Sequence, residues 1–227
     1  MKQLPLGVRL QDRAVFASFV AGANAEGLAA ARALAGESGP ALLYLHGAAG
    51  SGRSHLLQAI CAAVPGSGYF PLRELRALGA AVLDGVAGLP VVAIDDLDAV
   101  AGEPHWERQL FSLYNECRGT GARLVVAAAL PAPQLPVALP DLRSRLAAMP
   151  HYALRPLDEE GQRIALRQRA AARGIEMSEE TLLYLQRRFA RDMSSLNALL
   201  DRLDMASLEE QRRLTLPFIR EVLDRQA

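Results

Sequence analysis

The sequence predicts an α/β domain built on a parallel sheet, followed by a smaller domain made only of helices. Three observations carry this prediction. Short apolar runs alternate with helical patterns over the first two thirds of the chain, a glycine-rich loop joins one such run to a helix, and only helical patterns follow residue 158. Alternating β and α elements imply a parallel sheet with helices on both faces.

Strands are predicted where apolar residues run continuously between Gly, Pro or charged residues. These runs are 42–45, 91–94 and 124–128, with an edge strand near 151–154. Helices are predicted at roughly 24–35, 52–63, 72–79, 104–118 and 141–147. Asn24 is a possible N-cap, Pro104 suits a first turn, and Gly119 suits a C-terminal cap.

The C-terminal part contains only helical patterns, at roughly 158–173, 178–190, 193–209 and 216–225. Suitable N-caps and a C-terminal stop bound them: Asp158, Ser178, Thr215 and Gly174. We therefore expect three parts, an N-terminal tail at 1–10, an α/β domain at 11–155 and a helical domain at 156–227.

Composition argues against several classes of function. The 25 basic and 25 acidic residues cancel, and residues 155–227 hold 13 Arg and 13 Asp or Glu, which is not the charge pattern of a DNA-binding domain. No run approaches the roughly 18 apolar residues of a membrane span, and the N-terminus lacks the apolar segment of a signal peptide. We expect a cytoplasmic protein in which Cys61 and Cys117 are core thiols.

A glycine-rich loop follows the first predicted strand and opens a helix. Residues 47–54, Gly-Ala-Ala-Gly-Ser-Gly-Arg-Ser, have the spacing of a P-loop, whose glycines let backbone N–H groups turn toward phosphate oxygens. Ser54 is placed to bind Mg²⁺, and His55 has local packing as its alternative role. The residues expected to contact a nucleotide are Gly47, Gly50, Ser51, Gly52, Arg53, Ser54 and His55.

Arg53 stands where a P-loop usually has lysine. Lysine is a compact point charge on the β- and γ-phosphates, whereas a guanidinium is planar and larger. We expect Arg53 to bind phosphate without reproducing the geometry of γ-phosphate transfer. The alternative is a neutral replacement, because Lys2 is the only lysine in a chain with 25 basic residues.

A second phosphate motif ends the strand at 91–94. Asp95 and Asp96 follow it directly, in a Walker B pattern where Asp95 would hold Mg²⁺ and residue 96 would orient the attacking water. Active ATPases of this kind usually have Glu there. Asp96 is one methylene shorter and is a weak candidate for that role, and Asp98 adds a third acid.

The motifs together resemble the DnaA/Hda branch of the AAA+ family. The resemblance covers nearly the whole chain, in the segments 16–24, 53–57, 69–72, 106–107, 113–115, 139–146 and 213–218. It implies an AAA+ nucleotide-binding domain with a small helical lid. The chain stops where an initiator would continue into a DNA-binding domain, which favours the regulatory members of the branch.

The resemblance implies two interaction sites. Gln3-Leu4-Pro5-Leu6 is similar to a peptide that binds the DNA sliding clamp, offering a hydrogen-bonding side chain and two apolar anchors. Arg145 matches the position of an arginine finger that acts in trans on DnaA, and Arg143 could share or take that role.

Two sensor positions depart from the family pattern. Residues 127–130, Ala-Ala-Ala-Leu, lack the usual polar sensor, and Ser194 stands where the resemblance would put a second-sensor Arg, for which Arg191 could partly substitute. These departures leave binding of ADP or ATP with Mg²⁺ expected and γ-phosphate sensing weak. The resemblance implies an ADP-bound active state.

The expected function is that of a regulator. It binds the sliding clamp and an adenine nucleotide, stimulates ATP hydrolysis by DnaA, and so limits replication initiation; it meets DNA only through the clamp and could form homo-oligomers. The first alternative is a self-sufficient ATPase such as a helicase loader. The second, a DNA-binding initiator fragment, is disfavoured by the neutral charge of residues 155–227.

Overall fold

The computed structural model describes residues 14–36, 39–172 and 177–189, together with Leu203, Ala206, Ile219 and Glu221. Its internal contacts divide the chain into two compact units, Met1–Pro156 and Leu157–Ala227. Among the described residues, no helix is long and apolar enough to cross a membrane.

Five parallel strands form the sheet of the first unit, in the order β2-β3-β4-β1-β5. Their bounds are Leu42–Gly47 for β1, Gly68–Pro71 for β2, Val91–Asp95 for β3, Arg123–Ala128 for β4 and His151–Leu154 for β5. Every residue of β3 is buried, and so is the centre of β1 and β4. These strands have continuous apolar sequences because helices cover both faces.

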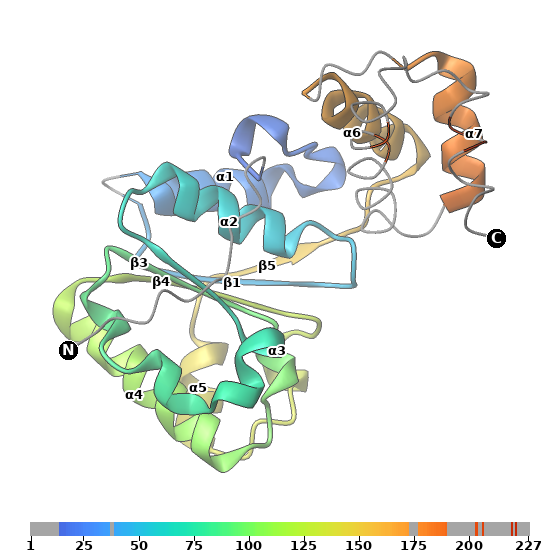
Figure 1. Cartoon of the computed structure of the whole chain (residues 1–227). Helices are drawn as coiled ribbons and strands as arrows, with labels where there is room; N and C mark the ends of the chain where they lie inside the picture. Colours follow the sequence, from blue (N-terminus) through green and yellow to red (C-terminus); the bar gives the residue numbers. More distant parts are fainter. Residues whose placement is uncertain are drawn as a thin grey trace. The chain divides into compact units, whose positions relative to one another are not determined.

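Figure 1 shows helices on both sides of this sheet. On one side lie α1 (Ala25–Ala35) and α2 (Arg53–Ala63), and on the other lie α3 (Leu72–Leu75), α4 (Pro104–Thr120) and α5 (Pro140–Ala147). Each side has its own apolar core, one containing Leu34 and Leu57 and the other Leu113 and Leu142. Short 3₁₀ turns join these elements at Phe16–Ser18, Gly22–Asn24, Arg76–Leu78, Ala80–Leu83, Val86–Gly88, Leu97–Ala99 and Ala132–Gln134.

The second unit contains α6 (Glu159–Ala171) and α7 (Glu179–Phe189). Asp158 caps α6 by accepting the Gly161 N–H at 2.8 Å, and the Ser178 hydroxyl accepts the Thr181 N–H at 3.3 Å, so both expected N-caps are present. Apart from the four residues named above, the helices expected at 193–209 and 216–225 lie outside the described residues, as do Gly174 and Thr215.

The parallel α/β architecture with a following helical unit confirms the predicted fold class. Three local features differ from the prediction, and the role of Asn24, described below, is a fourth. Strand β2 was not predicted because its four residues begin with Gly and end with Pro, which are uncommon in strands. It forms because β2 lies at the edge of the sheet, where Pro is tolerated. The helix expected at 72–79 ends at Leu75 and continues as a 3₁₀ turn. Gly121, with φ 78°, caps α4 in place of Gly119, since only the left-handed conformation at Gly121 ends that helix.

Asn24 does not cap α1 through its side chain. Its amide instead spans to the end of β5, donating from Nδ2 to the Arg155 carbonyl and accepting the Arg155 N–H at Oδ1, both at 2.8 Å. The side chain is 3% exposed. It therefore satisfies both backbone groups of a residue that leaves the sheet, which ties the segment before α1 to the end of β5.

We expect Asn24→Ala to lower the free energy of unfolding by about 2 kcal/mol, because two backbone groups lose their partner. Urea unfolding followed by the fluorescence of Trp106, the single and buried tryptophan, measures this change in the first unit. The matched control is Asn115→Ala, which removes one exposed bond within α4 and should cost less than about 0.5 kcal/mol. Equal losses for the two variants would contradict this role of Asn24.

Candidate functional site

The glycine-rich loop lies between the end of β1 at Gly47 and the start of α2 at Arg53. Gly52 has φ 95°, and a Cβ there would lie 2.7 Å from the ring of Phe19. A Cβ on Gly47 would lie 2.2 Å from the carbonyl oxygen of Leu154 on β5. Both positions therefore require glycine, one for its backbone conformation and both for close packing.

This loop fits an anionic phosphate group. The Ser51 side chain is buried, and its Oγ has no hydrogen-bond partner among the described residues. Buried polar groups normally have a partner, so this hydroxyl is suited to donate to a bound phosphate oxygen. The first turn of α2 also lacks intrahelical acceptors for its backbone N–H groups, and these point out of a helix end with positive potential. Phosphate oxygens would satisfy both sets of donors.

Asp95 lies at the end of β3 and is 1% exposed. Its Oδ2 accepts the Tyr69 hydroxyl at 2.8 Å, and its Oδ1 accepts the Asp96 N–H at 2.9 Å. Burial raises the pKa of Asp95, while hydrogen bonds from Ser54 and Tyr69 partly oppose that rise. The structure thus brings together Ser54 and Asp95, the two residues expected to bind Mg²⁺.

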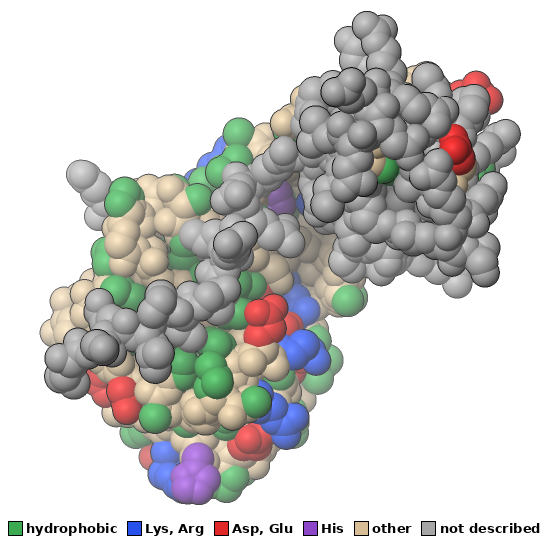
Figure 2. Space-filling model, viewed as in Figure 1, with side chains coloured by type: hydrophobic (Ala, Val, Ile, Leu, Met, Phe, Trp, Pro, Cys, Tyr) green, Lys and Arg blue, Asp and Glu red, His purple; other side chains and the backbone are tan. Residues whose placement is uncertain are grey.

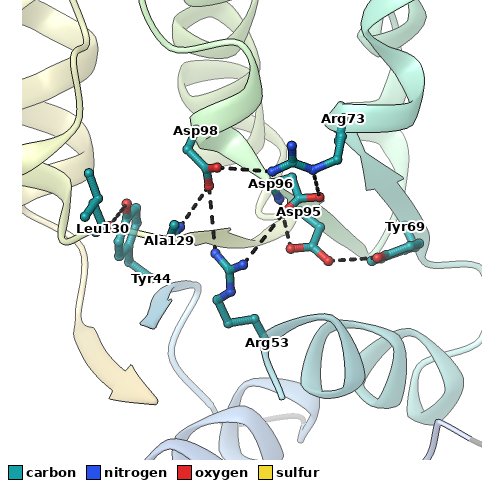
Figure 3. Close-up of polar contacts among 9 residues, drawn as sticks. All are labelled: Tyr44, Arg53, Tyr69, Arg73, Asp95, Asp96, Asp98, Ala129 and Leu130. Carbon is teal, nitrogen blue, oxygen red and sulfur yellow. Dashed lines mark hydrogen bonds and ion pairs between the residues drawn. The ribbon is translucent and has the colours of Figure 1, made fainter. Parts of the chain in front are cut away.

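Four charged side chains form a cluster beside Asp95 (Figure 3). Arg53 lies 3.8 Å from a carboxylate oxygen of Asp96 and 3.8 Å from one of Asp98. Arg73, at the start of α3, contacts the same two carboxylates at 3.0 and 3.4 Å. Two arginines and two aspartates therefore balance at the carboxyl end of β3. We call these four residues the Arg–Asp cluster.

Arg53 is held in this cluster by charge rather than by hydrogen bonds. Its side chain is only 11% exposed, and its 3.8 Å contacts are longer than a hydrogen bond. The buried Nη1 has no hydrogen-bond partner among the described residues. An unsatisfied guanidinium nitrogen at the base of the loop can donate to a phosphate oxygen, which fits the expected role of Arg53 in binding.

Asp96 is restrained in a different way. It is the single non-glycine residue with positive φ in the described part of the chain, with φ 52° and ψ 44°. Asp tolerates this left-handed conformation better than most residues. The Arg73 Nε donates to its Oδ2 at 3.0 Å, so the carboxylate expected to orient water is engaged by arginine on two sides.

The end of β4 presents backbone groups at the usual sensor position. The Ala129 N–H donates to Asp98 at 2.8 Å, and the Leu130 carbonyl accepts the Tyr44 hydroxyl at 2.9 Å. Ala128 pairs with His46, directly before the glycine-rich loop. The strand therefore reaches the site, but its last side chains are apolar, as the sequence indicates.

His55 projects from the first turn of α2 toward the N-terminal segment of the unit. Its Nε2 lies 3.0 Å from the Val15 carbonyl oxygen and 3.3 Å from the Ser18 hydroxyl. The ring of Phe19 meets the His55 ring edge-on, with 5.3 Å between centroids. In this structure His55 fixes residues 15–19 against α2.

Arg145 lies in the last turn of α5. It is exposed, and its guanidinium carbon lies 5.7 Å from the ring centroid of Tyr114 on α4. Arg143 is also exposed on the same helix. Leu142 and Leu146, one turn apart, are buried beneath them and fix which face of α5 is outward.

The remaining candidate residues, Gln3–Leu6, Arg191 and Ser194, lie outside the described residues. Sequence reasoning did not assign a role in the site to Tyr69 or Arg73. Tyr69 precedes Pro71 in the missed strand β2, so no strand signal placed it beside Asp95. Arg73 has no motif of its own, and only the fold brings it to Asp96.

The comparisons with known proteins agree with this fold. Domain III of the replication initiator DnaA from Thermotoga maritima has a TM-score of 0.80 with this chain at 22% identity, covering 95% of this chain and 98% of that one. DnaA from Aquifex aeolicus bound to AMPPCP gives 0.67 at 16% identity, covering 86% and 66%. The RuvB Holliday junction branch migration motor of Thermotoga maritima gives 0.56 at 16%, covering 80% and 60%.

The chain has the fold of DnaA domain III, with the glycine-rich loop after β1 and the acids at the end of β3. Residues 158–223 match the family model "Hda, lid domain". The predicted resemblance to the DnaA/Hda branch is confirmed by the fold shared with DnaA domain III and by the match of the second unit to the Hda lid model.

Proposed function

We propose that this chain is a regulator of the initiator DnaA, acting from the sliding clamp with a bound adenine nucleotide. The Hda-type lid at residues 158–223 is the observation that carries this proposal. The resemblance implies a protein that stimulates ATP hydrolysis by DnaA and thereby limits replication initiation. Figure 2 shows acidic and basic side chains interspersed on the visible face, which suits a protein that reaches DNA through the clamp.

Nucleotide binding is supported by the two unsatisfied donors at the glycine-rich loop, Ser51 Oγ and Arg53 Nη1. Solved structures of DnaA with this fold hold AMPPCP. When bound, Mg²⁺ would be held by Ser54 and Asp95 and would neutralise phosphate charge. The alanines at the end of β4 offer no side-chain donor to a γ-phosphate, so ADP is the nucleotide that the site favours.

Weak intrinsic hydrolysis is supported by the state of Asp96. A group that orients water must be free to accept its proton or hydrogen bond. Here the carboxylate faces Arg73 at 3.0 Å and Arg53 at 3.8 Å, and it is one methylene shorter than glutamate. Activation of water would require these arginines to release it.

The purified protein should bind ADP and turn over ATP far more slowly than the typical enzyme rate of about 10 per second. Arg53→Lys should keep ADP binding and remain slow, because Arg73 still engages Asp96. Calorimetric titration and steady-state turnover measure the two properties. Gly52→Ala is the negative control for binding, since its Cβ would meet Phe19. A parent rate near the typical enzyme value would favour the helicase-loader alternative.

The clamp contact is proposed for Gln3-Leu4-Pro5-Leu6. Changing Leu4 and Leu6 to Ala should abolish binding to purified clamp, because apolar anchors carry much of a short peptide's affinity. Surface plasmon resonance on immobilised clamp tests this. Val8→Ala, outside the motif, is the matched apolar truncation and should bind as the parent does. Parental affinity in the double variant would place the contact elsewhere.

The finger is proposed to be Arg145, exposed on α5 and outside its own nucleotide site. A guanidinium that enters the site of a neighbouring DnaA would stabilise charge that develops only in the transition state. Because that charge forms on DnaA, loss of Arg145 should leave the properties of this chain itself unchanged.

Arg145→Ala should retain folding, ADP binding and clamp binding but lose stimulation, since fingers supplied in trans contribute roughly 10³–10⁵ in rate. Arg145→Lys should also fail, because a point charge does not reproduce the planar fork. The assay is ATP hydrolysis by DnaA with clamp-loaded DNA, and Arg143→Ala is the matched control. Full stimulation by Arg145→Ala would remove the assignment, and selective loss in Arg143→Ala would move it two residues upstream.

A further inference from the structure

Glu107 on α4 is buried, at 2% exposed, yet its carboxylate forms no ion pair with a basic side chain among the described residues. Three backbone N–H groups take that place. Oε1 accepts those of Gly102 at 2.7 Å and Ala138 at 2.9 Å, and Oε2 accepts that of Leu139 at 2.7 Å. One carboxylate therefore joins the loop before α4 to the two residues before α5.

These bonds fix where α5 begins. Leu139 is the N-cap residue of α5, and Pro140 occupies its first turn. The carboxylate is bonded at the N-terminal end of the helix, where negative charge is favourable. Since α5 is only eight residues long, the placement of its first residues sets the placement of its last turn, which contains Arg145.

Tyr114 holds the other end of α5. It lies seven residues after Glu107, which is two turns along the same face of α4. Its ring is 3% exposed, and the Arg145 guanidinium lies over it at 5.7 Å from the centroid. That distance is within the range of a cation–π interaction, which restrains an exposed guanidinium without neutralising its charge.

We propose that Glu107 and Tyr114 are positioning residues for Arg145. Glu107 fixes the position of the first residues of α5, and Tyr114 orients the guanidinium of Arg145 in the last turn of that helix. Both act through Arg145 and neither contacts a nucleotide. The inference rests on the proposed function of Arg145 and extends it, because it gives α4 the task of presenting the finger in a fixed orientation to a partner's site.

The chemistry predicts distinct effects for conservative changes. In Glu107→Gln one oxygen becomes an NH₂ group, which cannot accept, so at least one of the three N–H groups loses its partner. A displacement of about 1 Å at a reacting group can cost about 100-fold in rate. Tyr114→Leu removes the π face, whereas Tyr114→Phe keeps it.

The experiment measures DnaA ATP hydrolysis with clamp-loaded DNA as the full-length variant is titrated, giving a maximal rate and a half-saturating concentration. Glu107→Gln should lower the maximal rate about 10-fold or more, and Tyr114→Leu about 2- to 5-fold, with little change in half-saturation. Tyr114→Phe should match the parent. Glu116→Gln, the same substitution at an exposed position of α4, is the control.

A purely structural role would give a different result. Loss of stimulation in proportion to the folded fraction, or a changed half-saturation at an unchanged maximal rate, would overturn the inference. So would equal activity of Tyr114→Leu and Tyr114→Phe. In the Arg145→Ala background, Glu107→Gln should have no further effect. Full stimulation by the Arg145→Ala variant would contradict the assignment of Arg145 as the finger. If Arg145→Ala loses stimulation but the Glu107 and Tyr114 variants keep it, only the positioning roles are contradicted.

Discussion

The site depends on one constraint, that parallel strands covered on both faces must stay apolar until they end. Within β3 every residue through Asp95 is buried, and the first acid appears only where the strand stops. Strand β1, which β4 separates from β3, ends at the same edge, where its register with β4 pairs His46 with Ala128. The acids at the end of β3 and the glycine-rich loop after β1 therefore lie at the carboxyl edge of the sheet, where the loop opens onto α2.

The charges at this edge balance internally. Arg53 and Arg73 face Asp96 and Asp98, so the Arg–Asp cluster, which excludes Asp95, holds two cations and two anions. The two arginines differ in their contacts. Arg53 is 11% exposed and makes no hydrogen bond within the described part of the chain, whereas Arg73 is 63% exposed and donates to Asp96 and Asp98. The buried one can turn to a phosphate while the exposed one keeps Asp96 engaged. This difference supports the proposal that Arg53 serves nucleotide binding and that Arg73 keeps hydrolysis weak.

Sequence reasoning reached the sheet, the loop and both acids because each has a strong local signal: continuous apolar strands, fixed glycine spacing, and acids at a strand end. It failed where position depends on tertiary contact. Gly68–Pro71 has little strand character, yet it forms the edge of the sheet and brings Tyr69 to Asp95. Asn24 is a residue type that often caps helices, but its side-chain amide bonds the backbone N–H and carbonyl of Arg155 instead. Nothing in the local sequence distinguishes Arg73 from any other surface arginine.

Helix α4 contributes both to the apolar core and to the proposed placement of Arg145. Its buried face supplies apolar side chains to the core and, two turns apart, a carboxylate and an aromatic ring that both reach toward α5. The Glu107 carboxylate accepts hydrogen bonds from backbone N–H groups, and each bond forms only when its donor lies in one position. These bonds therefore fix the backbone before α4 and before α5. Arg53 points to the chain's own Asp96 and Asp98, and Arg145 is exposed on a helix whose start and end both contact α4. We expect this arrangement in a protein that acts on a neighbour's nucleotide: Arg53 is suited to binding the chain's own nucleotide, and Arg145 is exposed and held in one orientation.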